Sequence, residues 1–153
     1  LHTYGEPSRD PRGHVLSIAY LGLAETSSME PLEPNYHLGR LELGTDGQSA
    51  EHALEVCRAD GSKMPIGFDH HQIIEHGLNE LRSRIFNSSL GYSMLRPEFT
   101  LRELRHLHET VLNEHLNKDN FRRKIIATGM LEETGRRQTH VGYRPAKLYR
   151  AAH

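Results

Sequence analysis

The chain has 153 residues, of which 36% are hydrophobic and 25% charged, with no tryptophan and a single cysteine. This length fits one domain, or one small domain joined to part of another, and the composition is too apolar for a disordered chain. No apolar run approaches the roughly 18 residues that a membrane helix needs, and one cysteine excludes an internal disulfide. We therefore expect a cytoplasmic protein without a membrane span.

The net charge of −1 hides two halves of opposite sign. Residues 1–95 hold seven basic and thirteen acidic side chains, a balance of −6. Residues 96–153 hold twelve basic and seven acidic side chains, a balance of +5. An acidic front and a basic back indicate two different tasks, and the basic part suits a polyanionic partner.

The first half alternates between short apolar segments and polar loops. Residues 2–4 end an extended segment, and residues 5–13 form a loop with two prolines and two glycines. Residues 15–23 are so apolar that we expect a central strand buried on both faces. A further strand is predicted over residues 37–43, whereas residues 50–58 fit either a strand or a short helix.

A helix is predicted to begin at Asp69, whose carboxylate can accept the free amide hydrogens of a first turn, with Gln72 at the capping-box position. Its apolar residues recur at helical spacing until the polar segment 87–89: Ile74, Leu78, Leu81 and Ile85.

The basic half begins with a strong signal for the start of a helix. Thr100 and Glu103 have the spacing of a capping box, and Phe99 and Leu104 occupy the positions of a hydrophobic staple. The apolar residues that follow lie along one helical face, and this helix is predicted to end within residues 113–115.

A second helix is predicted over residues 118–128, with Asn117 as its N-cap. Phe121 and Ile125, one turn apart, would face inward, and Gly129 stands where a left-handed C-terminal residue belongs. Two strands, residues 131–134 and 146–149, would then pair around a loop rich in glycine and arginine.

Helix, short turn, helix and a two-stranded wing with a basic tip is the order of a winged helix-turn-helix. The helix that begins at Asp69 would supply the third member of the bundle. The fold class that we expect is α+β.

The winged helix predicts binding of double-stranded DNA, because cations reach phosphates and a helix fits the major groove. With Phe121 and Ile125 inward, Asn120 and Arg123 face outward and could hydrogen-bond to adenine and guanine, and wing arginines could contact phosphate or the minor groove. The candidate DNA-binding residues are Lys118, Asn120, Arg122, Arg123, Lys124, Arg136, Arg137 and Arg144. The alternatives are a solvated helix face, or a winged helix that binds another protein.

The sequence offers no convincing metal-binding or catalytic motif. His71 and His76 are five residues apart on the helix from Asp69, which is poor spacing for a shared metal, and His106 and His108 diverge on the next helix. Phosphate-binding glycine loops and nucleophile elbows are absent from the sequence.

Two stretches resemble a known family. Residues 3–21, with Arg9-Asp10-Pro11-Arg12 ahead of an apolar strand, are similar to the segment of Nudix-fold proteins that follows the Nudix helix. The segments 68–70, 96–104, 120–124 and 142–149 resemble the C-terminal winged helix of Nudix-related transcriptional regulators.

The resemblance implies a partial Nudix-like sensor domain over residues 1–66, and a linking helix with a winged helix domain over residues 67–153. It implies a homodimer on a palindromic operator, relieved by ADP-ribose or a similar nucleotide-sugar, with genes of NAD or sugar metabolism as targets. Arg9 and Arg12 could bind that ligand, since guanidinium suits phosphate; a solvated loop is the alternative.

One departure from the family concerns catalysis. Nudix hydrolases carry a box whose glutamates hold Mg²⁺ against a pyrophosphate, and the present sequence has no such box; Glu132-Glu133-Thr134-Gly135 matches only its tail. We therefore expect no enzyme activity from this chain, with no catalytic residue and no metal site. The alternative is an ADP-ribose pyrophosphohydrolase whose box and Mg²⁺ site lie upstream of Leu1.

Overall fold

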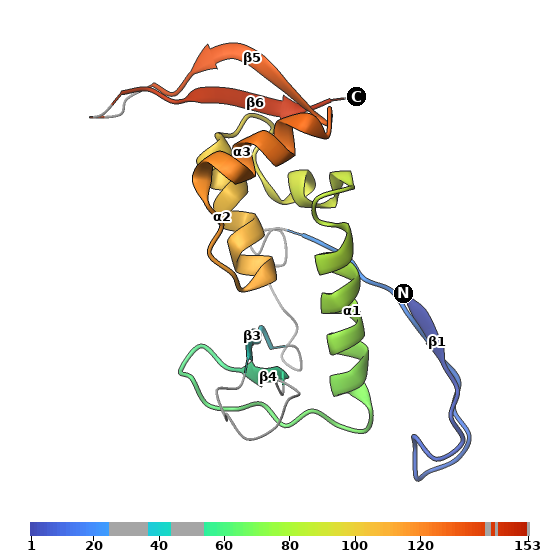
Figure 1. Cartoon of the computed structure of the whole chain (residues 1–153). Coiled ribbons are helices and arrows are strands. Elements are labelled where there is room, and N and C mark those ends of the chain that lie inside the picture. The colour runs from blue at the N-terminus through green and yellow to red at the C-terminus, as the bar shows by residue number, and fades with distance from the viewer. Residues whose placement is uncertain (25–36, 44–53, 140–141, 143, 153) are drawn as a thin grey trace. The chain divides into compact units, whose positions relative to one another are not determined.

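The computed structural model of the chain describes residues 1–24, 37–43, 54–139, 142 and 144–152 (Figure 1). By their internal contacts the residues form two compact units, Leu1–Gly22 with Thr26–Gly77, and Leu23–Glu25 with Leu78–His153. The predicted functional boundary between residues 66 and 67 stays a prediction.

The first unit contains a small antiparallel pair, β1 (His2–Tyr4) and β2 (Ser17–Ala19), in which Thr3 lies opposite Ile18. The strand predicted over residues 15–23 is therefore much shorter, and its predicted burial on both faces is wrong: Leu16 and Ile18 are 65% and 61% exposed. The reason is that an apolar run predicts a buried strand, but does not itself provide the neighbouring strands that would bury it. Among the described residues, β2 pairs with β1 alone.

A second pair in this unit joins β3 (Arg40–Leu43) to β4 (Leu54–Cys57), with Leu41 opposite Val56. This confirms the strand predicted within residues 37–43. Residues 50–58 were predicted as either a strand or a short helix, and residues 54–57 form a strand. Residues 50–53 lie outside the described part of the chain. Cys57, the single cysteine of the chain, is a buried free thiol.

Helix α1 (His70–Arg84) begins one residue after Asp69, as predicted. The Asp69 carboxylate, expected to cap the first turn, is instead bound by Arg9: its two oxygens accept hydrogen bonds of 2.7 Å from Nε and Nη2 of that arginine. The same guanidinium donates to the Ser17 hydroxyl at 2.7 Å. Arg9 thus fastens the loop after β1 to the start of α1 and to β2.

The second unit begins with the later part of α1 and continues through a 3₁₀ helix, η2 (Ser89–Met94), to helix α2 (Leu101–Leu112). The predicted capping box is present: the Thr100 hydroxyl accepts from the Glu103 amide at 3.1 Å, and the Glu103 carboxylate accepts from the Thr100 amide at 2.7 Å. Asn113 ends α2 in the left-handed conformation, within the predicted range.

Replacement of Thr100 by alanine is expected to destabilise the second unit by about 1 to 2 kcal/mol, because it leaves an amide of the first turn of α2 without its acceptor. The Thr100→Ser variant keeps the hydroxyl and should lose far less. Chemical unfolding followed by circular dichroism at 222 nm would compare the two variants; equal losses would show that the hydroxyl does not act as a cap.

Helix α3 (Lys118–Ala127) starts at its predicted N-cap, where the Asn117 side chain accepts from the amides of Asp119 and Asn120. Beyond Gly129, whose φ is +69°, the chain forms the hairpin of β5 (Leu131–Arg137) and β6 (Lys147–Ala151). Both strands are longer than predicted. The register shifts between Glu133 and Arg137, around a second glycine of positive φ, as in a β-bulge.

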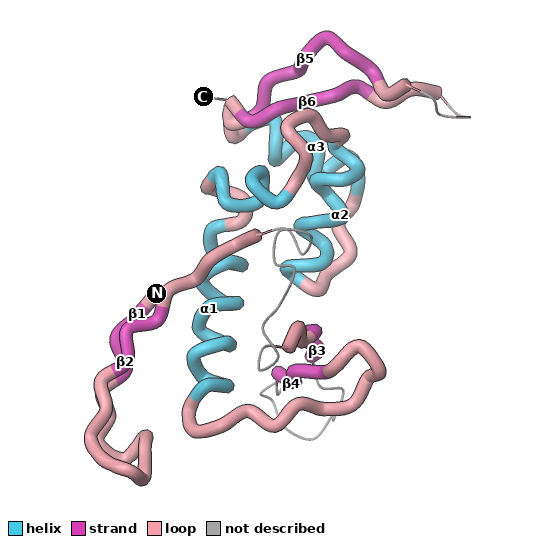
Figure 2. The backbone as a smooth tube through the Cα atoms, turned by 180° about the vertical axis from the view of Figure 1, so that it is seen from behind, coloured by secondary structure: helices cyan, strands magenta, loops and turns pink. Residues whose placement is uncertain are grey.

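The hairpin is tied to the helices through Phe99, which exchanges two backbone hydrogen bonds of 2.9 and 2.8 Å with Tyr149 of β6. Figures 1 and 2 show the hairpin lying beside α3 and α2. The core under it is formed by buried residues from η2, the segment before α2, and α2, α3 and β6: Tyr92, Phe99, Leu104, Phe121, Ile125 and Tyr149. The predicted inward positions of α3 are thereby confirmed.

α1 joins this bundle through Leu81, which packs with Ile85, the residue just after the helix, and with Val111 of α2, as predicted for the third helix. Behind this contact lies His108, fully buried on α2. Its Nδ1 is 2.9 Å from the Leu104 carbonyl oxygen and its Nε2 is 3.1 Å from the Ile85 carbonyl oxygen.

His108 is expected to make the second unit less stable in mild acid. Burial lowers the pKa of the imidazole below its ordinary value and the Lys124 ammonium adds to this, although the two carbonyls favour the charged form. Because the unfolded chain then binds the proton more readily, stability falls as the pH drops below about 6.5 toward the lowered pKa.

Thermal unfolding at pH 7.5 and pH 5.5 measures this effect. His108→Gln removes the titration and keeps an amide that can donate to the Ile85 carbonyl, so this variant should lose less stability between the two pH values than the wild type. An equal loss in both proteins would contradict the assignment to His108, since the other histidines are present in both.

Over the part of the chain that the structure describes, none of the helices combines the length and the apolar character needed to cross a membrane.

Candidate nucleic-acid interface

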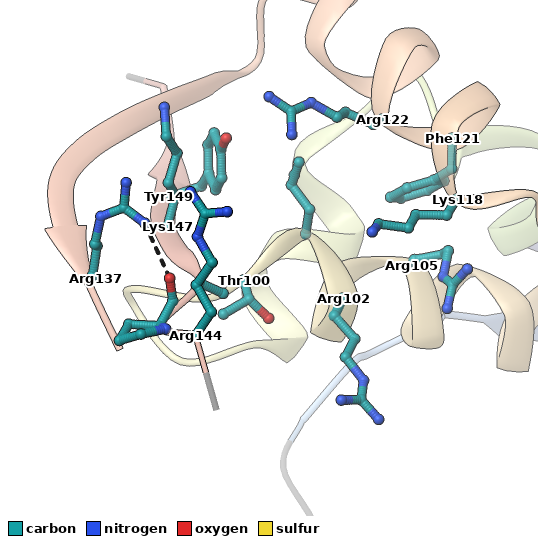
Figure 3. Close-up of a pocket in the computed structure, with 13 residues that line it drawn as sticks. Thr100, Arg102, Arg105, Lys118, Phe121, Arg122, Arg137, Arg144, Lys147 and Tyr149 are labelled. Atoms are coloured by element: carbon teal, nitrogen blue, oxygen red, sulfur yellow. Dashed lines mark hydrogen bonds between the residues drawn. The ribbon is translucent and has the colours of Figure 1, made fainter. Parts of the chain in front are cut away.

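A groove of about 560 Å³ lies between the first turns of α2 and α3 and the β5–β6 hairpin (Figure 3). Phe121 and Tyr149 of the core form part of its apolar lining. The remainder is strongly basic, and none of the lining residues is acidic. Its basic lining residues are Arg102, Arg105, Lys118, Arg122, Arg137, Arg144 and Lys147.

Four of these cations have no hydrogen bond, ion pair or ring contact with any other described residue. They are Arg102 of α2, Lys118 and Arg122 of α3, and Arg144 before β6. Every other lysine and arginine of the chain has such a partner among the described residues. The cations without partners therefore converge on one groove.

Figure 3 shows Lys118 and Arg122 reaching from α3 toward the hairpin, which carries Tyr149 on β6 and has Arg144 just ahead of that strand. The other three basic residues of the groove are engaged. Arg137 donates to the Pro145 carbonyl at 3.1 Å, Lys147 pairs with Glu133 at 2.8 Å, and Arg105 pairs with Glu109 at 3.8 Å.

The start of α2 at Thr100 and Leu101 and the start of α3 at Lys118 both border the groove. The N-terminal end of a helix carries a partial positive charge, because its first amide hydrogens lack intrahelical acceptors. Backbone and side chains therefore both make this groove attractive to anions.

The eight predicted DNA-binding residues divide between two surroundings. Lys118, Arg122, Arg137 and Arg144 line the groove. The other four are not among its lining residues: Asn120, Arg123, Lys124 and Arg136.

The four predicted residues outside the groove are held by contacts with other side chains. The Arg123 guanidinium donates to the Asn120 side chain at 2.9 Å, and the Lys124 ammonium lies 3.5 Å from the centre of the Phe86 ring. Arg136 pairs with Glu98 at 3.3 Å.

Sequence reasoning missed three basic lining residues, Arg102, Arg105 and Lys147. The first two are three positions apart in the first turns of α2 and lie off its apolar face, so helical spacing could have placed them on one side. Lys147 opens β6, and a strand start beside a basic loop gives no comparable signal.

Arg9 and Arg12, the two candidate ligand-binding residues, lie in the first unit. The Arg9 side chain is only 6% exposed and is bound to Asp69, whereas the Arg12 side chain is 74% exposed. Arg12 donates to Asp10 and holds the pKa of that carboxyl at about 2. Neither arginine is among the lining residues of the basic groove.

Among the described residues, no three or more histidine, cysteine, aspartate or glutamate side chains come close enough to hold a metal ion.

Comparison with known proteins places the basic half in a family. Residues 91–151 match the model of the NrtR DNA-binding winged helix domain. The chain is 32% identical over 148 residues to the ADPR responsive transcriptional repressor NtrR of Acinetobacter baylyi, covering 97% of this chain and 53% of that protein. The chain thus spans about half the length of this curated relative.

Two solved structures of Shewanella oneidensis NrtR are similar to the fold. The first has a TM-score of 0.68 at 29% identity, and the match covers 99% of this chain and 62% of the solved chain. The second, complexed with a 27mer DNA, has a TM-score of 0.66 at 28% identity and covers 98% and 62%. The predicted winged helix is thereby confirmed.

The chain therefore carries an NrtR-type winged helix domain and is homologous to the NrtR repressors, which are Nudix-related transcriptional regulators.

Proposed function

We propose that this chain binds double-stranded DNA as part of a transcriptional repressor. The observation that carries the proposal is the convergence of four cations without partners, Arg102, Lys118, Arg122 and Arg144, on one groove. A cation that is already paired must give up its partner before it can hold a phosphate, whereas these four can do so without that loss. The DNA complex of a similar protein supports the same partner.

The groove suits the phosphate backbone, and α3 suits the bases. Lys118 and Arg122 lie on the side of α3 that borders the groove, so a duplex whose backbone enters the groove would receive α3 in its major groove. Arg123 and Asn120 would then stand near base edges, and Arg136 on the hairpin would contact backbone or minor groove. Lys124, turned toward Phe86, would take a lesser part.

ADP-ribose, or a similar nucleotide-sugar, is the proposed effector, and release from DNA its proposed consequence. The name of the relative from Acinetobacter baylyi supports this. In the first unit Arg12 presents an exposed guanidinium that could bind a phosphate, while Arg9 would order the loop that carries it through Asp69. We further propose a homodimer on a palindromic operator, in which each protomer would place its own groove on one half of the operator. The proposed role is binding and not catalysis.

DNA binding can be tested by fluorescence anisotropy with labelled duplexes of about 30 base pairs enriched from a randomised library. We expect binding that weakens steeply as salt is raised from roughly 50 to 200 mM, because phosphate contacts release counterions. ADP-ribose would then be added to the complex. Absence of duplex binding at low salt would contradict the DNA proposal; binding that ADP-ribose leaves unchanged would contradict only the effector.

A further inference from the structure

Ile126 is an exception on the surface of the winged helix. Among the large apolar side chains that the structure describes from Leu78 onward, Ile126 alone is exposed, with 46% of its area accessible to solvent. The neighbouring Ile125 is completely buried, and the core beneath α3 is formed without Ile126. Packing of the domain therefore does not explain an isoleucine at this position.

The position of Ile126 on α3 is defined by its spacing from the groove. Lys118, Arg122 and Ile126 follow one another at intervals of four residues, so they form one row along the helix. The first two members of the row line the basic groove and have no partner among the described residues. Ile126 continues the row by one turn beyond the groove.

Lys124 lies on the opposite flank of α3, where Asn120 and Ala127 are exposed as well. There the Lys124 ammonium rests on the Phe86 ring, 3.5 Å from its centre. The exposed face of α3 thus includes the row of Lys118, Arg122 and Ile126, together with four further exposed residues, Asp119, Asn120, Arg123 and Ala127. Ile126 is the one large apolar side chain on this face.

We infer that Ile126 contacts the 5-methyl group of a thymine in the major groove. This rests on the proposed function, and names the base that the site would read. A side chain in the row beyond the phosphate contacts meets base edges, and the thymine methyl is the apolar group that base pairs present in the major groove. The partner recognised at this position is a T·A pair.

The test removes only that methyl group. Wild-type chain would first enrich its preferred duplexes from a randomised library, and each thymine of the enriched duplex would then be replaced in turn by deoxyuridine, which keeps the base pairing. We expect at least one position where wild-type affinity falls about 4-fold, the effect of one methyl group leaving an apolar contact. The Ile126→Ala variant should bind the thymine and deoxyuridine duplexes equally at that position.

Three results would overturn the inference. If deoxyuridine weakened binding nowhere, or weakened it equally for wild type and Ile126→Ala, Ile126 would not read a methyl group even though the chain binds DNA. If the wild type bound no duplex, the proposed function would fail and the inference with it. A circular dichroism spectrum of Ile126→Ala identical to wild type confirms that the comparison is made between folded proteins.

Discussion

Replacement of Lys118 and Arg122 together by alanine is expected to weaken binding to double-stranded DNA by roughly 10- to 100-fold at about 100 mM salt. Both side chains line the basic groove from α3 and lack a partner among the described residues. Their cationic groups are therefore available to phosphates, and their loss removes contacts that nothing nearby can replace. Fluorescence anisotropy with the enriched duplex measures the change.

The matched control removes the same two positive charges elsewhere in the second unit. Arg84 pairs with Glu80 and Arg150 pairs with Glu132, and both guanidinium groups lie outside the lining of the groove. The double variant Arg84→Ala/Arg150→Ala should bind DNA within about 3-fold of the wild type, because screening weakens the effect of distant charges. An equal loss in both double variants would mean that net charge acts, and not the groove.

Replacement of Phe121 by alanine is expected to destabilise the second unit by about 3 to 5 kcal/mol. The ring is 4% exposed and contacts two further rings, with centroids 5.1 Å from His108 and 6.2 Å from Phe86. It also lines the groove. The variant would therefore lose both packing in the core and the fixed placement of α3, and its DNA affinity should fall with the folded fraction.

Ile126→Ala is the control on the same helix. Its side chain is exposed and alanine is the better helix former, so the free energy of unfolding should change by less than about 1 kcal/mol. Urea unfolding followed at 222 nm compares the two variants. If Phe121→Ala were no less stable than Ile126→Ala, the core described for the winged helix would be wrong.

The winged helix could be predicted well because its signals are local. A capping box at Thr100 and Glu103, an N-cap at Asn117 and a left-handed glycine at Gly129 act within a few residues of themselves. The structure has each of them at its predicted place. Spacing of Phe121 and Ile125 likewise sufficed to orient α3.

The front half was harder because its signals depend on partners far along the chain. The apolar segment around β2 predicts burial, yet Ile18 is 61% exposed and β2 pairs only with β1 among the described residues. Asp69 illustrates the same limit: its position predicted a helix cap, but Arg9, sixty residues earlier, holds its carboxylate. Local rules cannot weigh a cap against a distant guanidinium.

The sequence predicted a basic interface on the winged helix, but only some of the residues that form it. Counting charges led to the basic half, but a sequence does not show which cations already have partners. Lys124 and Arg136 are held by Phe86 and Glu98, whereas Arg102 of α2 was overlooked and is without a partner among the described residues. Availability of a cation is a property of the folded surface.

The dependence of DNA affinity on salt tests the basic groove most directly. The wild type and the fourfold variant Arg102→Ala/Lys118→Ala/Arg122→Ala/Arg144→Ala would be titrated with the enriched duplex across a series of salt concentrations. If all four cations contact phosphate, the slope of log affinity against log salt should become shallower by about 3 to 4 per bound chain. An unchanged slope in a folded variant would contradict the conclusion that this groove holds the DNA backbone.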